Sequence, residues 1–405
     1  MNARGAKNAA LKEMAACLLA EGMHRLRNVP RITDVDTMAS VLTELGCRVH
    51  WAGDHELSIG VPSAGRLGTA APASFVSQLR ASIVVLGPLL ARTGSVALPL
   101  PGGDDFGTRP VNFHLEGLSA MGADVRVLRG VIEAHTPPPG RLRGARLTLE
   151  YPSHTATDNL LMAAVTAEGT TIIDNAAREP EVEDLASMLN TMGAEISGLG
   201  TSRLVIEGVD SLRPADHEVV ADRVVAATYL AVATITGGEV TVVDARREHM
   251  ETLLRKLATI GADLEGETGI TAKGPQRPGS CDIATLPYPG VATDYKPLLV
   301  ATLAIADGTS VVTENLFAGR FRYVEELERL GARVSTEGHH VVIRGVERLR
   351  GAAVRATDVR AGAALVLAGL VADGETVVAN AAHVERGYED LAGTLRSLGA
   401  DVERV

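Results

Sequence analysis

The sequence has 405 residues, 46% of them hydrophobic but only 3% aromatic, and it contains 42 glycines. This length exceeds one typical hydrophobic core, so two domains are expected, and a core of Ala, Val and Leu joined by many tight turns favours an α/β protein over a β-sandwich. The formal net charge of −11 excludes nonspecific binding to nucleic acid or anionic membranes, because phosphates are held by an excess of Lys and Arg.

The N-terminal stretch lacks the pattern of a targeting peptide, because Lys12 and Glu13 interrupt its apolar residues. No segment approaches roughly 18 uninterrupted apolar residues, so no transmembrane helix is expected. Cys17, Cys47 and Cys281 are far apart and odd in number, which fits neither a disulfide framework nor metal-ligand spacing. A reducing cytoplasm is therefore the expected location, and no metal site is predicted.

One phrase, of the form LxxLGAxV, occurs six times along the chain. Its glycines are Gly46, Gly122, Gly193, Gly261, Gly331 and Gly399, and an upstream glycine precedes each, at Gly22, Gly94, Gly169, Gly238, Gly308 and Gly374. Each repeat predicts a helix ending at its upstream glycine, a strand, a second helix ending at the Leu-Gly pair, and another strand. The spacing of roughly 70 residues is longer than that of ordinary solenoid units, so we expect two groups of three repeats that divide near residues 212–223.

Several predicted helices begin beside a basic residue. These residues are Lys7 next to the expected N-cap Asn8, Arg320, Arg360 after the expected N-cap Asp358, and Arg386. A helix N-terminus carries partial positive charge, so a basic residue there is unfavourable unless an anion binds nearby. Each alone is explained as a solvated charge or as the partner of a nearby carboxylate. At equivalent places in repeats, however, they jointly indicate a site for a polyanion.

The stretch LPLPGGDDFGTRPVNFH, from Leu98 to His114, places two carboxylates in a glycine-rich loop before Arg109. It lacks the Lys-Ser/Thr pair of a nucleoside-triphosphate loop, and no further acidic or histidine residues keep a metal-ligand spacing. The glycines permit close backbone approach, Arg109 can bind a phosphate through two N–H groups, and Asp104 or Asp105 can exchange a proton. A simple polar turn that caps the helix after Pro110 explains the same residues.

Six segments together resemble the UDP-N-acetylglucosamine 1-carboxyvinyltransferase family of enolpyruvyl transferases. They are GAKNAAL (residues 5–11), LRASIVVLGPLLAR (79–92), PGGDDFGTRPVNFH (101–114), AEGTTIIDNAAREPEVEDL (167–185), ATDVRAGAALVLAGLVADGETVV (356–378) and HVERGYEDL (383–391). The shikimate-pathway enolpyruvyl transferase is a related family with the same fold. The resemblance implies two inside-out α/β domains, each of three repeated modules (six repeats in all), with a cleft between the domains. Residues 6–219 would form the first domain and carry the Asp104 loop; residues 220–405 would form the second, with residues 1–5 as a stub of its N-terminal strand.

The activity implied by the resemblance is transfer of the enolpyruvyl group of phosphoenolpyruvate to a hydroxyl of UDP-N-acetylglucosamine, with release of phosphate, which commits the sugar nucleotide to peptidoglycan. The family needs no metal or other cofactor. Two alternatives stay open: a paralogous transferase that acts on another nucleotide in secondary metabolism, and an inactive relative that binds UDP-sugars. The expected partners are the substrates phosphoenolpyruvate and UDP-N-acetylglucosamine, without nucleic acid or membrane, and no oligomeric state is predicted.

The resemblance also implies the site residues. As catalytic residues it implies Asp104, the proton donor to carbon 3 of the enol, Asp294, the acceptor of the hydroxyl proton, Lys7 and Arg386. The substrate-binding residues would be Lys7, Asn8, Arg80, Arg109, Pro110, Val111, Asn112, Phe113, Tyr151, Ser153, His154, Asp294, Leu316, Arg320, Arg360 and Arg386. Tyr151 to His154 would hold uridine and diphosphate. Asp294 can also be the N-cap of the helix that follows it.

The sequence departs from the family pattern at several places. Asp104 stands where many members carry a cysteine that epoxide antibiotics of the fosfomycin type alkylate, and since a carboxylate is a poorer nucleophile, insensitivity to fosfomycin is expected. Asn112 replaces an aspartate near the uracil, Val225 replaces a glutamate, and Lys296 lies in a turn that commonly contains glutamine. The chain also starts later than its relatives, either because the start codon was assigned late or because a strand is absent.

Overall fold

The computed structural model describes residues 1–104, 110–138, 140–317 and 319–405. Two compact units emerge. The first unit comprises the described residues of 5–103 and 109–220, and the second comprises Met1–Arg4, Asp104 and Ala221–Val405. Asp104 therefore belongs with the second unit, although we expected it in a domain of residues 6–219. The physical reason is that its carboxylate accepts a hydrogen bond from Arg386, which lies near the C-terminal end of the second unit.

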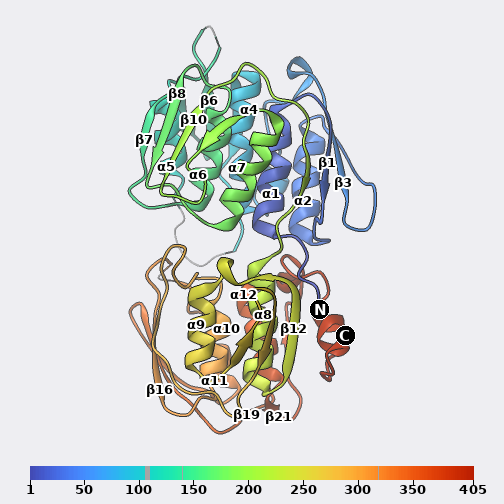
Figure 1. Ribbon diagram of the computed structural model, residues 1–405, viewed down its shortest axis with the longest axis vertical. Coiled ribbons are helices and arrows are strands. Elements are labelled where there is room, and N and C mark those ends of the chain that lie inside the picture. The colour runs from blue at the N-terminus through green and yellow to red at the C-terminus, as the bar shows by residue number, and fades with distance from the viewer. Residues whose placement is uncertain (105–109, 139, 318) are drawn as a thin grey trace. The chain divides into compact units, whose positions relative to one another are not determined.

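Three modules build the first unit (Figure 1). The first module contains α1 (Lys7–Ala16), η1 (Cys17–Leu19), β1 (Gly22–Arg27), α2 (Thr33–Glu44), β2 (Arg48–Trp51) and β3 (Leu57–Val61). The second contains η2 (Ala64–Arg66), α3 (Ala73–Val76), η3 (Arg80–Val85), α4 (Leu86–Thr93), β4 (Ser95–Pro99), α5 (Asn112–Ala120), β5 (Asp124–Leu128) and β6 (Val131–His135). The third contains β7 (Arg146–Thr148), α6 (His154–Ala164), β8 (Thr170–Asp174), α7 (Pro180–Met192), β9 (Glu195–Ser197) and β10 (Arg203–Glu207), followed by β11 (Asp216–Glu218). The sheet orders are β11-β1-β3-β2, β4-β6-β5 and β7-β8-β10-β9.

The second unit repeats this plan with a smaller last module. Its first module contains α8 (Arg223–Thr236), β12 (Glu239–Arg246), η4 (Arg247–His249), α9 (Glu251–Thr259), β13 (Asp263–Glu265) and β14 (Thr268–Lys273). The next contains β15 (Ile283–Ala284), α10 (Lys296–Leu303), β16 (Thr309–Thr313), α11 (Val324–Arg329), β17 (Arg333–Glu337) and β18 (His340–Arg344). The last contains β19 (Leu349–Arg350), β20 (Ala353–Arg355), α12 (Val359–Gly369), β21 (Ala372–Asp373), β22 (Val377–Ala379), α13 (Ala382–Glu385) and α14 (Leu391–Ser397). The sheets are β12-β14-β13, β15-β16-β18-β17, β19-β21 and β20-β22.

The module boundaries follow from the repeated glycines. All six glycines of the repeated phrase have φ between 87° and 108°, the left-handed region in which a glycine ends a helix without a Cβ clash. The upstream glycines, all of which the structure describes, were predicted to end helices, and Gly94 does so as the C-cap of α4. In the fourth repeat Gly237, with φ of 69°, ends α8, one residue before the predicted Gly238. The prediction was wrong at Gly22, Gly169, Gly308 and Gly374, because the preceding helices end earlier, at Leu19, Ala164, Leu303 and Gly369.

Helices lie inside each unit and sheets outside, the inside-out arrangement that the resemblance implied (Figure 1). In the second unit α8, α10 and α12 contact one another, and nearly every residue of these three helices is buried. In the first unit α4 approaches α6 so closely that a Cβ on Gly87 would lie 2.2 Å from the carbonyl oxygen of Asn159. Such close helix packing explains why the core uses Ala, Leu and Val rather than aromatic side chains.

Several local predictions were wrong. Five repeats end in a hairpin of two strands rather than in one strand, and the sixth has no strand over 401–405. Asn8 lies inside α1, whose N-cap is Ala6. Arg386 is the C-cap of α13, and Arg320 precedes α11 without opening it. Asp358 does cap α12 as predicted. Among the described residues, no helix combines the length and apolar character needed to cross a membrane.

Candidate active site

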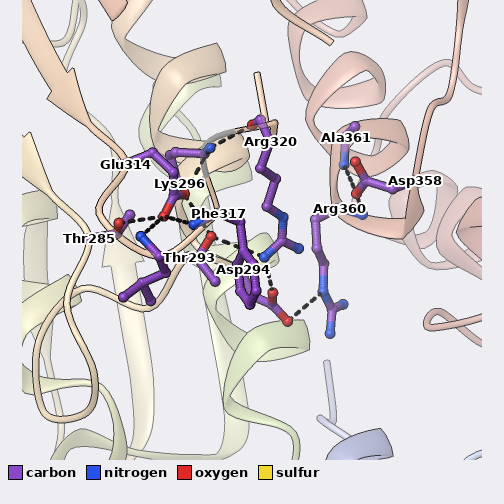
Figure 2. A network of polar contacts seen from close by, with 11 residues as sticks. Thr285, Thr293, Asp294, Lys296, Glu314, Phe317, Arg320, Asp358, Arg360 and Ala361 are labelled. Atoms are coloured by element: carbon purple, nitrogen blue, oxygen red, sulfur yellow. Dashed lines mark hydrogen bonds and ion pairs between the residues drawn. The ribbon is translucent and has the colours of Figure 1, made fainter. Parts of the chain in front are cut away.

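Asp294, in the second unit, binds two arginines from distant parts of the sequence (Figure 2). Its Oδ1 lies 2.7 Å from a guanidinium nitrogen of Arg320, and its Oδ2 accepts a hydrogen bond of 3.3 Å from Nε of Arg360. Both arginine side chains are at most 5% exposed, whereas Asp294 is 25% exposed. The carboxylate of Asp294 is thus the most accessible of these three charged groups, and it lies beside two buried guanidiniums.

Local structure explains the positions of these three side chains. Asp294 comes just before α10, whose N-cap is Tyr295 and makes no side-chain cap, so the expectation that Asp294 caps this helix was wrong. Its carboxylate oxygens contact the arginines instead. The Oδ1 of Asp358 accepts hydrogen bonds from the backbone nitrogens of Arg360 and Ala361 at the start of α12. This cap fixes the backbone from which Arg360 extends.

Electrostatics keeps both arginines charged. Burial alone lowers the pKa of Arg320, but Asp294 and Asp358 outweigh it and the pKa is raised. Burial also opposes the charge of Arg360, yet Tyr388, Asp294 and other groups raise its pKa above the usual value. The guanidinium carbon of Arg360 lies 5.4 Å from the ring centre of Tyr388. The group therefore offers two fixed positive charges beside one carboxylate, an arrangement suited to an anionic ligand that gives up a proton nearby.

A second, wholly buried ion pair adjoins Asp294. Lys296, the first residue of α10, places its Nζ 2.9 Å from Oε2 of Glu314, and both side chains are 0% exposed. Burial lowers the pKa of Lys296 to about 8, against the opposing effect of Glu314. Burial alone would raise the pKa of Glu314, but Lys296 and the hydroxyls of Thr285 and Thr293 outweigh it and the pKa is lowered. The pair is therefore ionised at neutral pH.

Asp104 contacts two residues from the end of the chain. Its Oδ1 accepts a hydrogen bond from Arg386 and lies 3.7 Å from Nδ1 of His383. The structure thus joins two of the predicted site residues, Asp104 and Arg386. Asp105 and Arg109 lie outside the described residues.

In the first unit, Lys7 is the first residue of α1 and forms an ion pair of 2.6 Å with Asp34. The Lys7 side chain is 12% exposed and that of Asp34 only 4%. Asn8 follows it in the first turn and is partly buried. A lysine that is held by a buried carboxylate at a helix start has a fixed direction, which is the property needed to bind a small anion.

The ends of the glycine-rich loop converge on Arg80. Its guanidinium donates to the backbone oxygens of Pro101, at 3.3 Å, and Pro110, at 3.4 Å. Asn112 opens α5 and donates to Glu116 at 3.4 Å. Val111, the N-cap of α5, and Phe113 pack partly against the core of the first unit. The structure therefore brings together two of the predicted residues, Arg80 and Pro110.

The YPSH segment forms the start of α6. Ser153 is the N-cap and accepts a hydrogen bond of 3.4 Å from the backbone nitrogen of Ala156, while Tyr151 is 38% exposed. Nε2 of His154 lies 3.1 Å from Nζ of Lys12 and 3.5 Å from Asp158. Burial raises the pKa of Asp158 to about 7, although Lys12 opposes this. His154 therefore contacts both members of the buried pair formed by Lys12 and Asp158.

One set of side chains has the donor atoms of a cation site. Glu13, Asp184 and His217 present ligand atoms within 4.8 Å of one another in the described part of the first unit. However, Asp184 already accepts hydrogen bonds from His217, at 3.0 Å, and from the backbone nitrogen of Val220, at 2.8 Å. Burial, and then the charge of Asp184, raise the pKa of Glu13. Nε2 of His217 lies 3.7 Å from Oε1 of Glu13, so His217 contacts both carboxylates.

Residues 1–395 match the family described as EPSP synthase (3-phosphoshikimate 1-carboxyvinyltransferase). The UDP-N-acetylglucosamine 1-carboxyvinyltransferase of Nocardia farcinica is 49% identical over 407 residues, which cover 99% of this chain and 94% of that protein. The chain belongs to the carboxyvinyltransferase family. A second relative with the same name, from Corynebacterium jeikeium, is 48% identical over 402 residues, covering 99% of this chain and 95% of that protein.

Solved structures resemble this carboxyvinyltransferase in fold. The enolpyruvyl transferase NikO from Streptomyces tendae has a TM-score of 0.87 at 24% identity, covering 100% of this chain and 95% of that one. EPSP synthase from Acinetobacter baumannii has a TM-score of 0.78 at 20% identity, covering 100% and 96%. The fold class and the family resemblance predicted from the sequence are both confirmed.

Two buried ion pairs of this carboxyvinyltransferase, Lys296 with Glu314 and Lys12 with Asp158, were not predicted from the sequence. A signal was present for the first pair, because Lys296 is the only charged residue of the apolar helix KPLLVATL. A charged residue in such a helix must find a buried partner. Nothing in the sequence identified Glu314 as that partner.

Proposed function

We propose that this carboxyvinyltransferase transfers the enolpyruvyl group of phosphoenolpyruvate to a hydroxyl of UDP-N-acetylglucosamine and releases phosphate, as a step of peptidoglycan synthesis in the cytoplasm. Relatives with 48% and 49% identity carry this acceptor in their names, which supports the choice. The observation that carries the proposal is the carboxylate of Asp294, held between two buried arginines and itself the most exposed of the three. A base beside fixed cations matches a reaction between two anionic substrates.

The residues take the following roles in this proposal. Asp294 accepts the proton of the acceptor hydroxyl as the hydroxyl oxygen adds to carbon 2 of phosphoenolpyruvate, and Asp104 protonates carbon 3. Carbon 3 then loses a proton as phosphate leaves carbon 2, which restores the double bond. Arg320 and Arg360 bind the carboxylate of the enol; Lys7, Arg109 and Arg386 bind its phosphate.

Most of the residues that we propose to bind the acceptor lie in the first domain, residues 6–219. Arg80 would contact the nucleotide sugar, and residues 110–113 the uracil. The α6 N-terminus with Ser153 would bind the diphosphate, because the positive end of the helix dipole favours anions. Asn8, Tyr151, His154 and Leu316 would complete the binding site. The second domain, residues 220–405, would supply the base and the arginines around it.

Phosphate release from phosphoenolpyruvate tests the proposal directly. The purified protein is incubated with phosphoenolpyruvate and UDP-N-acetylglucosamine, and then with a panel of other nucleotides in place of the sugar nucleotide. Release that depends on UDP-N-acetylglucosamine, with an enolpyruvyl ether as the product, supports the proposal. Release with a different nucleotide alone would favour a paralogous transferase, for which Asn112, in place of the usual aspartate, is the supporting observation. Absence of release with every acceptor would refute both.

A further inference from the structure

Lys296 is buried at a place where a charge needs a specific reason. Its ammonium is 0% exposed at the start of the apolar helix α10. It contacts Oε2 of Glu314 at 2.9 Å, donates to the backbone oxygen of Arg320 at 2.5 Å, and lies 3.9 Å from the ring centre of Phe321. Removing an ammonium from water is unfavourable unless such partners replace the lost hydration.

Glu314 extends this contact toward the proposed base (Figure 2). It accepts hydrogen bonds of 2.7 Å from the hydroxyls of Thr285 and Thr293. Its Oε1 also accepts from the backbone nitrogen of Leu316 at 2.9 Å. One carboxylate therefore joins α10, the residue before Asp294 and the segment that leads to Arg320.

Arg320 is consequently held at both ends. Lys296 binds its backbone oxygen, while its guanidinium donates to the hydroxyl of Thr293 at 3.1 Å and pairs with Asp294 at 2.7 Å. Thr293 in turn donates to Glu314. The Lys296–Glu314 pair thus contacts both Thr293, which precedes Asp294, and Arg320, which pairs with it.

We propose that Lys296 is a positioning residue for the transfer reaction: through Glu314 and the backbone of Arg320 it sets the place of the Arg320 guanidinium against Asp294. The proposal rests on the proposed role of Asp294 as the base. A pair that only filled the core would be replaceable by neutral side chains of similar volume without loss, as is often found for buried ion pairs. A small displacement of a positioned charge, by contrast, slows the reaction strongly, by about 100-fold for 1 Å.

Three variants separate these two roles: Lys296→Met, Lys296→Met with Glu314→Gln, and the control Lys256→Met. Lys256 lies in the same unit and donates to the backbone oxygen of Asp282 at 2.7 Å, away from Asp294. The readouts are the melting temperature, the single-turnover rate constant and KM for UDP-N-acetylglucosamine. The rate constant does not depend on the fraction of active protein, so partial misfolding does not imitate a slow step.

We expect Lys296→Met to melt roughly 10 °C lower, because Glu314 keeps a buried charge without its ammonium. The double variant regains most of this loss yet stays slow, by about 30- to 100-fold in the rate constant, with KM changed less than about threefold. Lys256→Met keeps the wild-type rate within about twofold. A wild-type rate constant in the double variant would overturn the proposal.

A crystal structure of the double variant gives a readout that needs no substrate. The proposal expects the distance of 2.7 Å between the Arg320 guanidinium and Asp294 Oδ1 to lengthen or the contact to break. An unchanged contact would overturn the positioning role even if turnover fell. If the wild-type protein releases no phosphate with any acceptor while the contact does break in the variant, the proposed function fails and the structural inference holds.

Discussion

The pair of arginines around Asp294 makes a specific prediction for Asp294→Asn. The amide keeps the shape of the side chain but removes the negative charge that separates two guanidiniums of at most 5% exposure. Removing one partner of a buried ion pair costs about 3–5 kcal/mol, and because Asp294 is itself 25% exposed we expect the lower value, about 3 kcal/mol.

At about 2–4 °C per kcal/mol for a unit of this size, the melting temperature should fall by about 6–12 °C. Turnover should fall by about 10²- to 10⁴-fold, the usual contribution of a general base. Inorganic phosphate should stabilise the variant more than the wild-type protein, because an added anion replaces the missing carboxylate between the guanidiniums. At a hundred times its Kd, such a ligand contributes about 2.7 kcal/mol.

The assay is thermal unfolding followed by circular dichroism, with and without phosphate, alongside phosphate-release kinetics. The matched control is Asp373→Asn, which removes a carboxylate from an ion pair with Arg348 in which both side chains are more than 60% exposed. Such a pair contributes little, so the control should melt like the wild-type protein. The reasoning would be refuted if Asp294→Asn melted at the wild-type temperature and responded to phosphate no more than the control does.

Three further predictions concern carboxylates. Asp104→Asn should reduce turnover at least about 100-fold, and retained activity would remove Asp104 from the acid role. Fosfomycin should not inactivate the wild-type protein with time, whereas Asp104→Cys should become sensitive; inactivation of the wild type at levels that stop a cysteine-containing relative would contradict this. The pKa of Asp158 is raised from 3.8 to about 7 by burial, so the folded state holds a proton that the unfolded state has released between these values. Stability from this group is therefore complete below about pH 4 and is lost as pH rises through 7, by about 3 kcal/mol between pH 5 and 8. Urea unfolding at these two pH values should show that the free energy of unfolding changes less with pH in Asp158→Asn than in the wild-type protein. An equal change with pH in both proteins would argue against a proton held by Asp158.

The sequence predicted the six modules because each depends on a local requirement. A helix that ends in a left-handed turn needs glycine at that point, and all six glycines of the repeated phrase have positive φ. The hairpins and the missing last strand could not be predicted in this way. Whether a short polar segment pairs as a strand depends on a neighbouring edge, and the sequence pattern of 401–405 contains no information about that edge.

The positions of two arginines could not be predicted from the helix dipole. Arg320 and Arg386 were expected at helix starts, where an anion would explain them, but one precedes a helix and the other ends one. The family resemblance nevertheless selected residues that the structure joins to carboxylates, Arg320 to Asp294 and Arg386 to Asp104. The helix dipole predicted the wrong backbone positions for these arginines, because a long side chain can reach a carboxylate from several backbone positions.

The structure also indicates which departures from the family pattern can affect the choice of acceptor nucleotide. Lys296 and Val225 depart from the family, and from the sequence alone either change bears on the nucleotide. Lys296 is 0% exposed and contacts Glu314 and Arg320, so its ammonium acts on the group around Asp294 and cannot touch a ligand directly. Val225 lies in the first turn of α8, where its backbone nitrogen donates to the capping Asp222. Asn112 is then the departure best placed to contact an acceptor, since it opens α5 and retains both an amide donor and a carbonyl acceptor for a base such as uracil.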